Sequence, residues 1–167
     1  MVNKEDKLWM RSALSLAALA EAKGEVPVGA ILVLEGKKIG EGLNSSIHYH
    51  DPTAHAEILA LRQGGKTIGN YRITGAVMYV TLEPCLMCIG AMIHARISRI
   101  AFGAKAVKNN EMSLCLSVLS STQINHNITL CPNILAEACS LQLSTFFKRK
   151  RNQQKNDYIN NRVINAN

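Results

Sequence analysis

Hydrophobic and polar positions follow helical and extended periods in turn along the chain. In the first 23 residues, apolar side chains recur at helical spacing and polar ones fill most positions between them. This pattern predicts an amphipathic first helix that ends at Gly24 and has apolar positions at Leu8, Trp9, Leu16 and Ala20.

A β-hairpin is predicted next. Residues 26–34 are mostly apolar and β-rich, Glu35-Gly36 is a turn signal, and residues 37–42 can return as the second strand. A polar loop then runs from residue 44 to residue 51.

The middle of the chain carries two helix-start signals with a strand between them. Asp51-Pro52 offers an N-cap side chain followed by proline at the first helical position, and the helix should stop near Gly64-Gly65. Residues 76–82 have the continuous apolar pattern of a buried strand. Glu83-Pro84 repeats the helix-start signal, and this second helix should run through Ile93.

The last third of the chain is less regular. Residues 98–102 predict a short strand ended by a glycine, and residues 128–130 predict the last strand. The stretch between them is ambiguous, with a short helix expected around 114–119. Pro132 then opens a long amphipathic helix that ends in a basic run.

This succession of elements predicts a three-layer α/β/α fold with a central five-stranded sheet, mixed because of the initial hairpin. Carboxyl ends of parallel strands and amino ends of helices share one edge of such a sheet, where ligands usually bind. The helix starts at 51–57 and 83–88 should therefore be neighbours. We expect one compact domain over residues 1–151, followed by a basic, polar tail over 152–167.

The composition of the 167 residues is that of a globular protein, with 47% apolar and 19% charged residues, which excludes global disorder. No apolar stretch reaches the roughly 20 residues of a membrane span. The net charge of +7 is uneven: residues 146–167 hold six basic and one acidic side chain, and the first 145 residues hold 13 basic and 11 acidic ones. A basic end suits a polyanionic partner, nucleic acid before membrane surface, although a solvated tail would look the same.

Two features predict a cytoplasmic protein. The Ala/Leu-rich start resembles a secretion signal, but Glu5 and Asp6 interrupt its basic region. The five cysteines are odd in number and include a Cys-x-x-Cys pair, which favours metal ligation or thiol chemistry over a secreted disulfide framework.

Three side chains at the two helix starts make a candidate zinc site: His55, Cys85 and Cys88. The two cysteines are three residues apart and so share a helix face. Two thiolates and an imidazole suit zinc, and a site with only three protein ligands keeps a position for water, which is the catalytic arrangement. The remaining cysteines have no obvious spacing for a fourth ligand: Cys115, Cys131 and Cys139.

Glu57 follows His55 by two residues, so it need not bind the metal and can instead move a proton. Each feature has a structural explanation when taken alone, since a first-turn glutamate is favoured by the helix dipole and a Cys-x-x-Cys pair can be redox-active or simply buried. Together, His-Ala-Glu and Pro-Cys-x-x-Cys form the signature of zinc nucleobase deaminases.

The chain resembles the bacterial tRNA-specific adenosine deaminases, which have the cytidine-deaminase-like fold. The resemblance covers nearly the whole chain and goes well beyond the zinc motifs. It rests on residues 26–30, 42–44, 50–65, 79–85, 90–94 and the Phe146-Phe147 pair with its basic continuation.

The resemblance implies a reaction and its machinery. His55, Cys85 and Cys88 would bind one Zn²⁺ per subunit, and Glu57 would be the proton shuttle. The reaction would be hydrolytic deamination of adenosine to inosine at the wobble position of a tRNA anticodon, whose loop bases can be splayed into a pocket.

The same resemblance implies substrate contacts and assembly. Asn44 would hydrogen-bond the target base, although its sequence context alone favours a turn residue. Phe147 and Arg149 would grip the anticodon loop by stacking and phosphate binding, with at least one residue of the Phe146-Phe147 pair in the core. A homodimer is implied as well.

One region departs from the family pattern. Residues 105–110 are shorter than expected, and Ala106 stands where the family has an acidic residue that helps to hold the RNA. Two other functions stay open. A deaminase of a free nucleobase, nucleoside or nucleotide would use the same zinc chemistry, and a non-catalytic RNA-binding partner would keep the fold but would not need Glu57.

Overall fold

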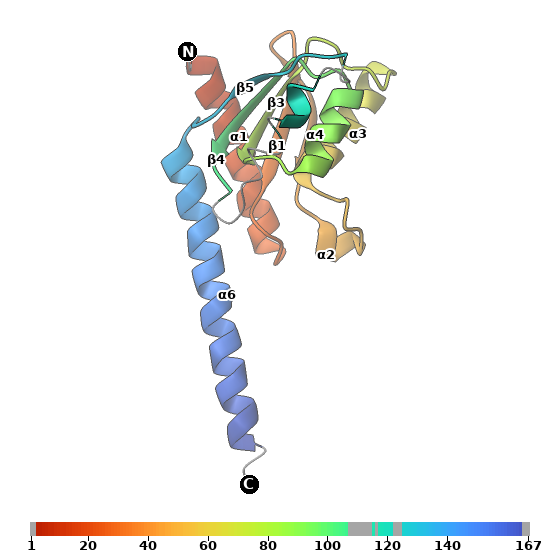
Figure 1. Ribbon diagram of the computed structural model, residues 1–167. Helices are drawn as coiled ribbons and strands as arrows, with labels where there is room; N and C mark the ends of the chain where they lie inside the picture. Colours follow the sequence, from red (N-terminus) through yellow and green to blue (C-terminus); the bar gives the residue numbers. More distant parts are fainter. Residues whose placement is uncertain (1–2, 107–114, 116, 122–124, 165–167) are drawn as a thin grey trace.

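The computed structural model of the protein describes residues 3–106, 115, 117–121 and 125–164 (Figure 1). A five-stranded mixed sheet lies between two helical layers, which confirms the predicted fold class. The strand order is β2-β1-β3-β4-β5. The strands are β1 (Gly29–Leu34), β2 (Lys37–Leu43), β3 (Val77–Leu82), β4 (Arg99–Ala104) and β5 (Thr129–Cys131).

The sheet is mixed because the predicted hairpin forms. Strand β1 pairs antiparallel with both β2 and β3, while β3, β4 and β5 run parallel to one another. The carboxyl ends of β3 and β4 therefore lie at one edge of the sheet. Helix α4 begins at that edge, directly after β3.

Helices cover both faces of the sheet. Helices α1 and α6 pack on one face, against β1, β3 and β4, and α3 and α4 lie together on the other face (Figure 1). No helix in the described ranges is both long enough and apolar enough to cross a membrane. The helices are α1 (Lys4–Ala22), α2 (Ser46–Tyr49), α3 (Ala56–Ile68), α4 (Leu86–His94) and α6 (Ala136–Ile164).

The first helix forms as predicted but turns a different face to the core. Leu8 is 55% exposed, and only Ala20 of the expected apolar positions is fully buried. Small side chains are required at Ala13 and Ala17 because the helix backbone there lies directly on Gly29, with the carbonyl of Ala13 too close for any side chain at position 29. The buried residues of α1 are Asp6, Met10, Ala13, Ala17 and Ala20.

Helix α3 begins and ends later than predicted. The Asp51 carboxylate accepts hydrogen bonds from the amide and hydroxyl of Thr53, both at 2.7 Å, and this local turn delays the helix start until His55 caps it. The helix continues through Gly64, which has no side chain and therefore fits against Leu32 of β1. The short helix α2 was not predicted.

Three other elements have boundaries that differ from the predicted ones. Helix α4 begins at Leu86, with Cys85 as its cap, rather than at Glu83-Pro84. Strand β4 continues through Gly103, because α6 packs so closely there that a side chain would collide with Cys139. Helix α6 begins after a left-handed Leu135 and continues without a break past residue 151.

The ambiguous stretch is described in part. Residues 115 and 117–119 are helical, in agreement with the expected short helix, and residues 107–114 and 116 lie outside the described ranges. Strand β5 lies within one residue of its predicted place.

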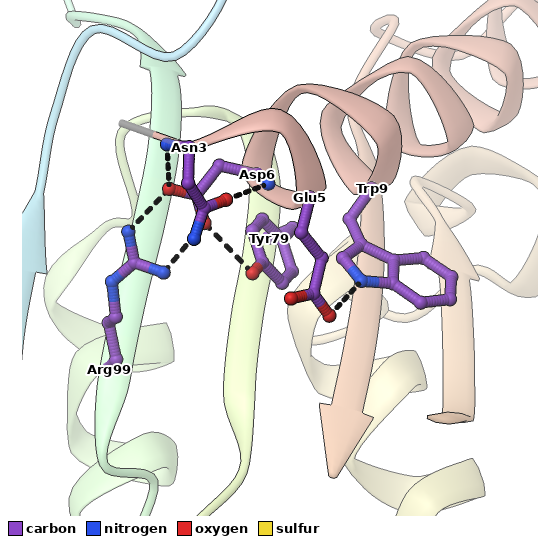
Figure 2. Close-up of polar contacts among 6 residues, drawn as sticks. All are labelled: Asn3, Glu5, Asp6, Trp9, Tyr79 and Arg99. Carbon is purple, nitrogen blue, oxygen red and sulfur yellow. Dashed lines mark hydrogen bonds and ion pairs between the residues drawn. The ribbon is translucent and has the colours of Figure 1, made fainter. Parts of the chain in front are cut away.

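A buried polar cluster ties α1 to the sheet (Figure 2). The fully buried Asp6 carboxylate accepts two bonds from Arg99 of β4, at 2.7 and 3.0 Å, and one from the Tyr79 hydroxyl of β3 at 3.0 Å. Asp6 also forms a capping box with Asn3, the N-cap of α1. The start of α1 is thereby fixed over the two central parallel strands.

Candidate metal centre

Two of the three predicted ligands occupy helix caps. His55 is the N-cap of α3 and Cys85 is the N-cap of α4, both with extended backbone, and neither side chain bonds the amides of its own helix. An N-cap and the third residue after it lie close together, which is the geometry that joins the two side chains of a capping box. Cys88 takes that third position, so its sulfur lies beside that of Cys85.

The ligand atoms form a nearly equilateral triangle. The two sulfurs are 3.6 Å apart, and His55 Nδ1 lies 3.7 Å from the Cys85 sulfur and 3.6 Å from the Cys88 sulfur. With Zn–S near 2.3 Å and Zn–N near 2.0–2.1 Å, a tetrahedral site needs separations of about 3.6–3.8 Å. The three side chains therefore fit a zinc ion, and they are the group of metal-binding side chains found in the described part of the chain.

The electrostatics of the triad favour a thiolate. The Cys85 and Cys88 sulfurs share a hydrogen bond at 3.6 Å, and with the help of His55 this contact lowers the pKa of Cys85 to about 4. The same contact and burial raise the pKa of the Cys88 thiol, because a second thiolate beside the first would be repelled. The hydrogen bond with Cys85 in turn raises the pKa of His55. A divalent cation removes this repulsion and binds both sulfurs as thiolates.

Glu57 lies in the first turn of α3 and is almost completely buried, with 4% of its surface exposed. Burial is the main reason that its pKa is raised above the usual 4.5 of a glutamate. A carboxyl group with a raised pKa exchanges protons more readily near neutral pH than an ordinary glutamate does. Its position two residues from His55 places this group beside the metal ligands.

Asn44 follows β2 directly and is held next to the ligand segment. The backbone amide of Asn44 donates to the carbonyl of Val28, and the backbone amide of Ser45 donates to the carbonyl of Ala54, both at 3.0 Å. Since Ala54 precedes His55, these bonds fix the Asn44 backbone near the triad.

The predicted RNA contacts on α6 lie in the other helical layer. Phe146 is buried in the core, as expected for one member of the pair, and Phe147 is 41% exposed. Arg149 pairs with Glu21 of α1 at 2.9 Å. Among the described residues, α6 contacts β4, β3 and α1, so the structure does not join these side chains to the metal triad directly.

Two buried glutamates that hold the backbone of neighbouring segments were missed by sequence reasoning. Glu25 is 1% exposed and accepts a hydrogen bond at 2.8 Å from the amide of His48 in α2. Glu83 accepts one at 3.2 Å from the amide of Ala106 and so fixes the start of the segment that departs from the family pattern. Residues 107–110 of that segment lie outside the described ranges. A glutamate beside an apolar run was the available signal for Glu25.

Comparisons with known proteins agree with this geometry. Residues 3–104 match the family described as the cytidine and deoxycytidylate deaminase zinc-binding region. A tRNA-specific adenosine deaminase of Buchnera aphidicola subsp. Baizongia pistaciae is 51% identical over 166 residues, covering 98% of this chain and 100% of that protein. The Haemophilus influenzae protein of the same name is 50% identical over 151 residues, covering 90% and 87%. The Bacillus subtilis one is 38% identical, covering 90% and 94%.

Solved structures of deaminases are also similar to this protein. A structure from a study of A-to-I editing by tRNA:A34 deaminases at the wobble position of transfer RNA superposes with a TM-score of 0.76 and 36% identity. The superposed region covers 81% of this chain and 98% of the chain in that structure. A guanine deaminase from Bacillus subtilis is more distant, with a TM-score of 0.59 and 28% identity over 90% of this chain and 95% of that one.

Proposed function

Because the chain belongs to the tRNA-specific adenosine deaminases, within the zinc-dependent cytidine and deoxycytidylate deaminase family, we propose that it converts adenosine to inosine at the wobble position of a tRNA anticodon. The observation that carries this proposal is the His55–Cys85–Cys88 triangle with Glu57 beside it. Identity to the tRNA enzymes extends through α6, which is the basic end of the molecule.

His55, Cys85 and Cys88 hold one zinc ion per subunit. Zinc bound with three protein ligands lowers the pKa of a water molecule and so supplies a nucleophile near neutral pH. Because both cysteines bind as thiolates, much of the ion's positive charge is neutralised, and a separate proton acceptor becomes more important.

Glu57 provides that acceptor. Its carboxylate takes a proton from the attacking water and delivers it to a ring nitrogen of adenine, while the remaining hydroxide adds at C6. The carboxylate then moves the proton of the new C6 hydroxyl to the amino group, the C6–N bond breaks, and ammonia leaves as the C6 carbonyl forms. The atoms balance as adenosine plus water giving inosine plus ammonia. Burial of Glu57 supports this role, because a raised pKa makes the protonated form accessible during turnover.

The remaining site residues are assigned to substrate binding. Asn44 orients the target base, a role supported by its fixed backbone next to the ligand segment. Phe147 and Arg149 contact the anticodon loop, a role supported by the partial exposure of both side chains on α6.

The proposal also includes a location and an oligomeric state. The protein acts in the cytoplasm, where tRNA is found. It acts as a homodimer. A surface depression of about 600 Å³ between α3 and α4 supports the dimer, since it has a mainly apolar lining that includes Ile58, Leu61 and Ala91. Sedimentation equilibrium of the purified protein tests the dimer, and a mass of one 18.3 kDa chain would contradict it.

The decisive experiment incubates the zinc-loaded protein with total bacterial tRNA and measures inosine by nucleoside analysis. Wild type and an E137Q control, which changes an exposed glutamate on α6, should form inosine. An E57Q variant should keep one zinc and its tRNA affinity but lose more than 99% of turnover, since general acid–base catalysis contributes about 10²–10⁴-fold. Ammonia released from free guanine or cytidine, with none from tRNA, would favour the small-molecule deaminase instead. Unchanged turnover in E57Q would refute the role of Glu57.

A further inference from the structure

Helix α6 has a side that packs on the body and a side that does not. On the packed side, Phe146 is 3% exposed, the Gln142 side chain donates to a carbonyl of α1 at 3.5 Å, and Arg149 pairs with Glu21. From residue 147 to residue 158 every side chain is exposed. Figure 1 shows the carboxyl-terminal part of α6 projecting well beyond the body, on the same side as α2.

Three basic side chains line the unpacked side: Lys148, Arg151 and Lys155. At 100° per residue, they lie about 160°, 140° and 180° around the helix from Phe146. They form one row about 10 Å long, which we call the basic face. All three side chains are exposed.

Among the described residues, no acidic side chain forms an ion pair with the basic face. Lys148 and Arg151 are three residues apart and Arg151 and Lys155 are four apart, and like charges at these spacings destabilise a helix. Residues 147–158 contain five basic side chains and only Asp157 as an acidic one. The row therefore lowers the stability of the projecting helix unless a polyanion lies against it.

The position of Phe147 indicates which part of an RNA meets the basic face. Exposed aromatic side chains stack on unpaired bases, and Phe147 directly follows Phe146, after which every side chain of α6 through residue 158 is exposed. The basic face begins one residue later and leads away from the body. Duplex RNA is bound mainly through its shape and its backbone, so a row of cations without base-reading groups suits a helical stem better than a loop.

We propose that the basic face binds phosphates of the duplex stem that adjoins the anticodon loop. The inference rests on the proposed function, which supplies a tRNA as the substrate, and it assigns the projecting part of α6 to the stem rather than to the edited loop. Stem binding adds affinity without reading sequence, since phosphate contacts position a nucleic acid but carry no base information.

The test compares two charge-matched variants of the full-length, zinc-loaded protein. R151Q/K155Q removes two positive charges from the basic face, and K4Q/K7Q removes two from exposed positions at the start of α1. Each protein is titrated by fluorescence anisotropy with an anticodon stem-loop and with a single strand of the same loop sequence that has no complementary stem. Titrations are repeated from 50 to 200 mM salt, and circular dichroism checks the helix content.

For the stem-loop, R151Q/K155Q should raise Kd roughly tenfold and reduce the slope of log K against log salt by about 2, while the control changes Kd less than twofold. For the single strand, all three proteins should bind alike. An equal loss on both RNAs would overturn the inference, and so would a loss no larger than that of the control. Inosine formation by the wild type is measured in parallel, so failure of the proposed function is seen separately from failure of this contact.

Discussion

Replacing Asp6 with asparagine tests the buried cluster that joins α1 to the sheet. This carboxylate accepts four hydrogen bonds at 2.7–3.1 Å. Two come from the Arg99 guanidinium, one from the Tyr79 hydroxyl and one from the backbone amide of Asn3. Asp6 is fully buried, whereas 24% of the Arg99 side chain is exposed, so water can partly satisfy the arginine once the carboxylate is gone. We therefore expect a loss of about 3 kcal/mol in the free energy of unfolding, the lower end for a broken buried ion pair. In a chain of this size, that loss lowers Tm by roughly 6–12 °C.

The loss should depend on pH in a defined direction. The hydrogen bond from Arg99 is the main cause that holds the pKa of Asp6 below its usual 3.8. A carboxyl group with a lowered folded-state pKa contributes stability that is fully present above its unfolded value and is lost as pH falls through the folded value. The gap between wild type and D6N should therefore be full at pH 7 and should shrink as pH falls below about 4.

Urea denaturation at pH 7 and pH 3 measures both effects, with E5Q as the matched control. Glu5 is the neighbouring carboxylate, but it is exposed and accepts a single bond from the Trp9 indole at 3.2 Å (Figure 2). Its replacement should change the free energy of unfolding by less than about 0.5 kcal/mol. Equal losses in D6N and E5Q, or a gap that stays constant in acid, would refute the assigned role of the cluster.

Three further outcomes follow from the structure. E25A removes the buried acceptor of the His48 amide and should lower kcat/KM for tRNA several-fold at unchanged zinc content. E25Q keeps an acceptor oxygen and should recover most of this loss, so equal kinetics in the two variants would count against a positioning role for Glu25. G103A places a methyl group against the Cys139 sulfur and should lower the free energy of unfolding, measured in urea, by about 2–3 kcal/mol. In the control G24A the new methyl group has no neighbour within 4 Å but the backbone has a positive φ, so the loss should be only about 1 kcal/mol. Removal of zinc by a chelator should lower Tm, and added zinc should restore it, because the ion binds only the assembled triad; a Tm that does not respond would argue against a resident metal.

The metal ligands were predictable because their signal is chemical and local. The spacing of Cys85 and Cys88 fixes their shared position on a helix start, and the alternation of strands and helices brings His55 to them. The sheet was predictable for a similar reason, since a continuous apolar run and a Glu-Gly turn act over a few residues. The roles of Asn44 and of the α6 side chains remain predictions.

The boundaries that sequence reasoning missed depend on packing between distant segments. Gly64 and Gly103 were interpreted as breaks, but each lies inside a regular element because a neighbouring chain approaches too closely for a side chain. The face of α1 was misassigned for the same reason, since contact with Gly29 favours alanine over the larger leucines. Such requirements are set by the partner segment, and periodicity within one helix does not reveal them.

His55 and Cys85 are both helix N-caps and metal ligands, so the residue type that best stabilises the helix start differs from the one that binds zinc. Aspartate and serine are among the best N-cap residues, because their side chains bond the first free amides of a helix. Either one at position 55 or 85 would improve the start of α3 or α4 in the metal-free chain, yet it would remove a nitrogen or sulfur that zinc requires. Selection for the thermal stability of the metal-free chain alone would therefore favour an inactive protein, whereas selection for zinc binding and turnover keeps a histidine and a cysteine at these sites.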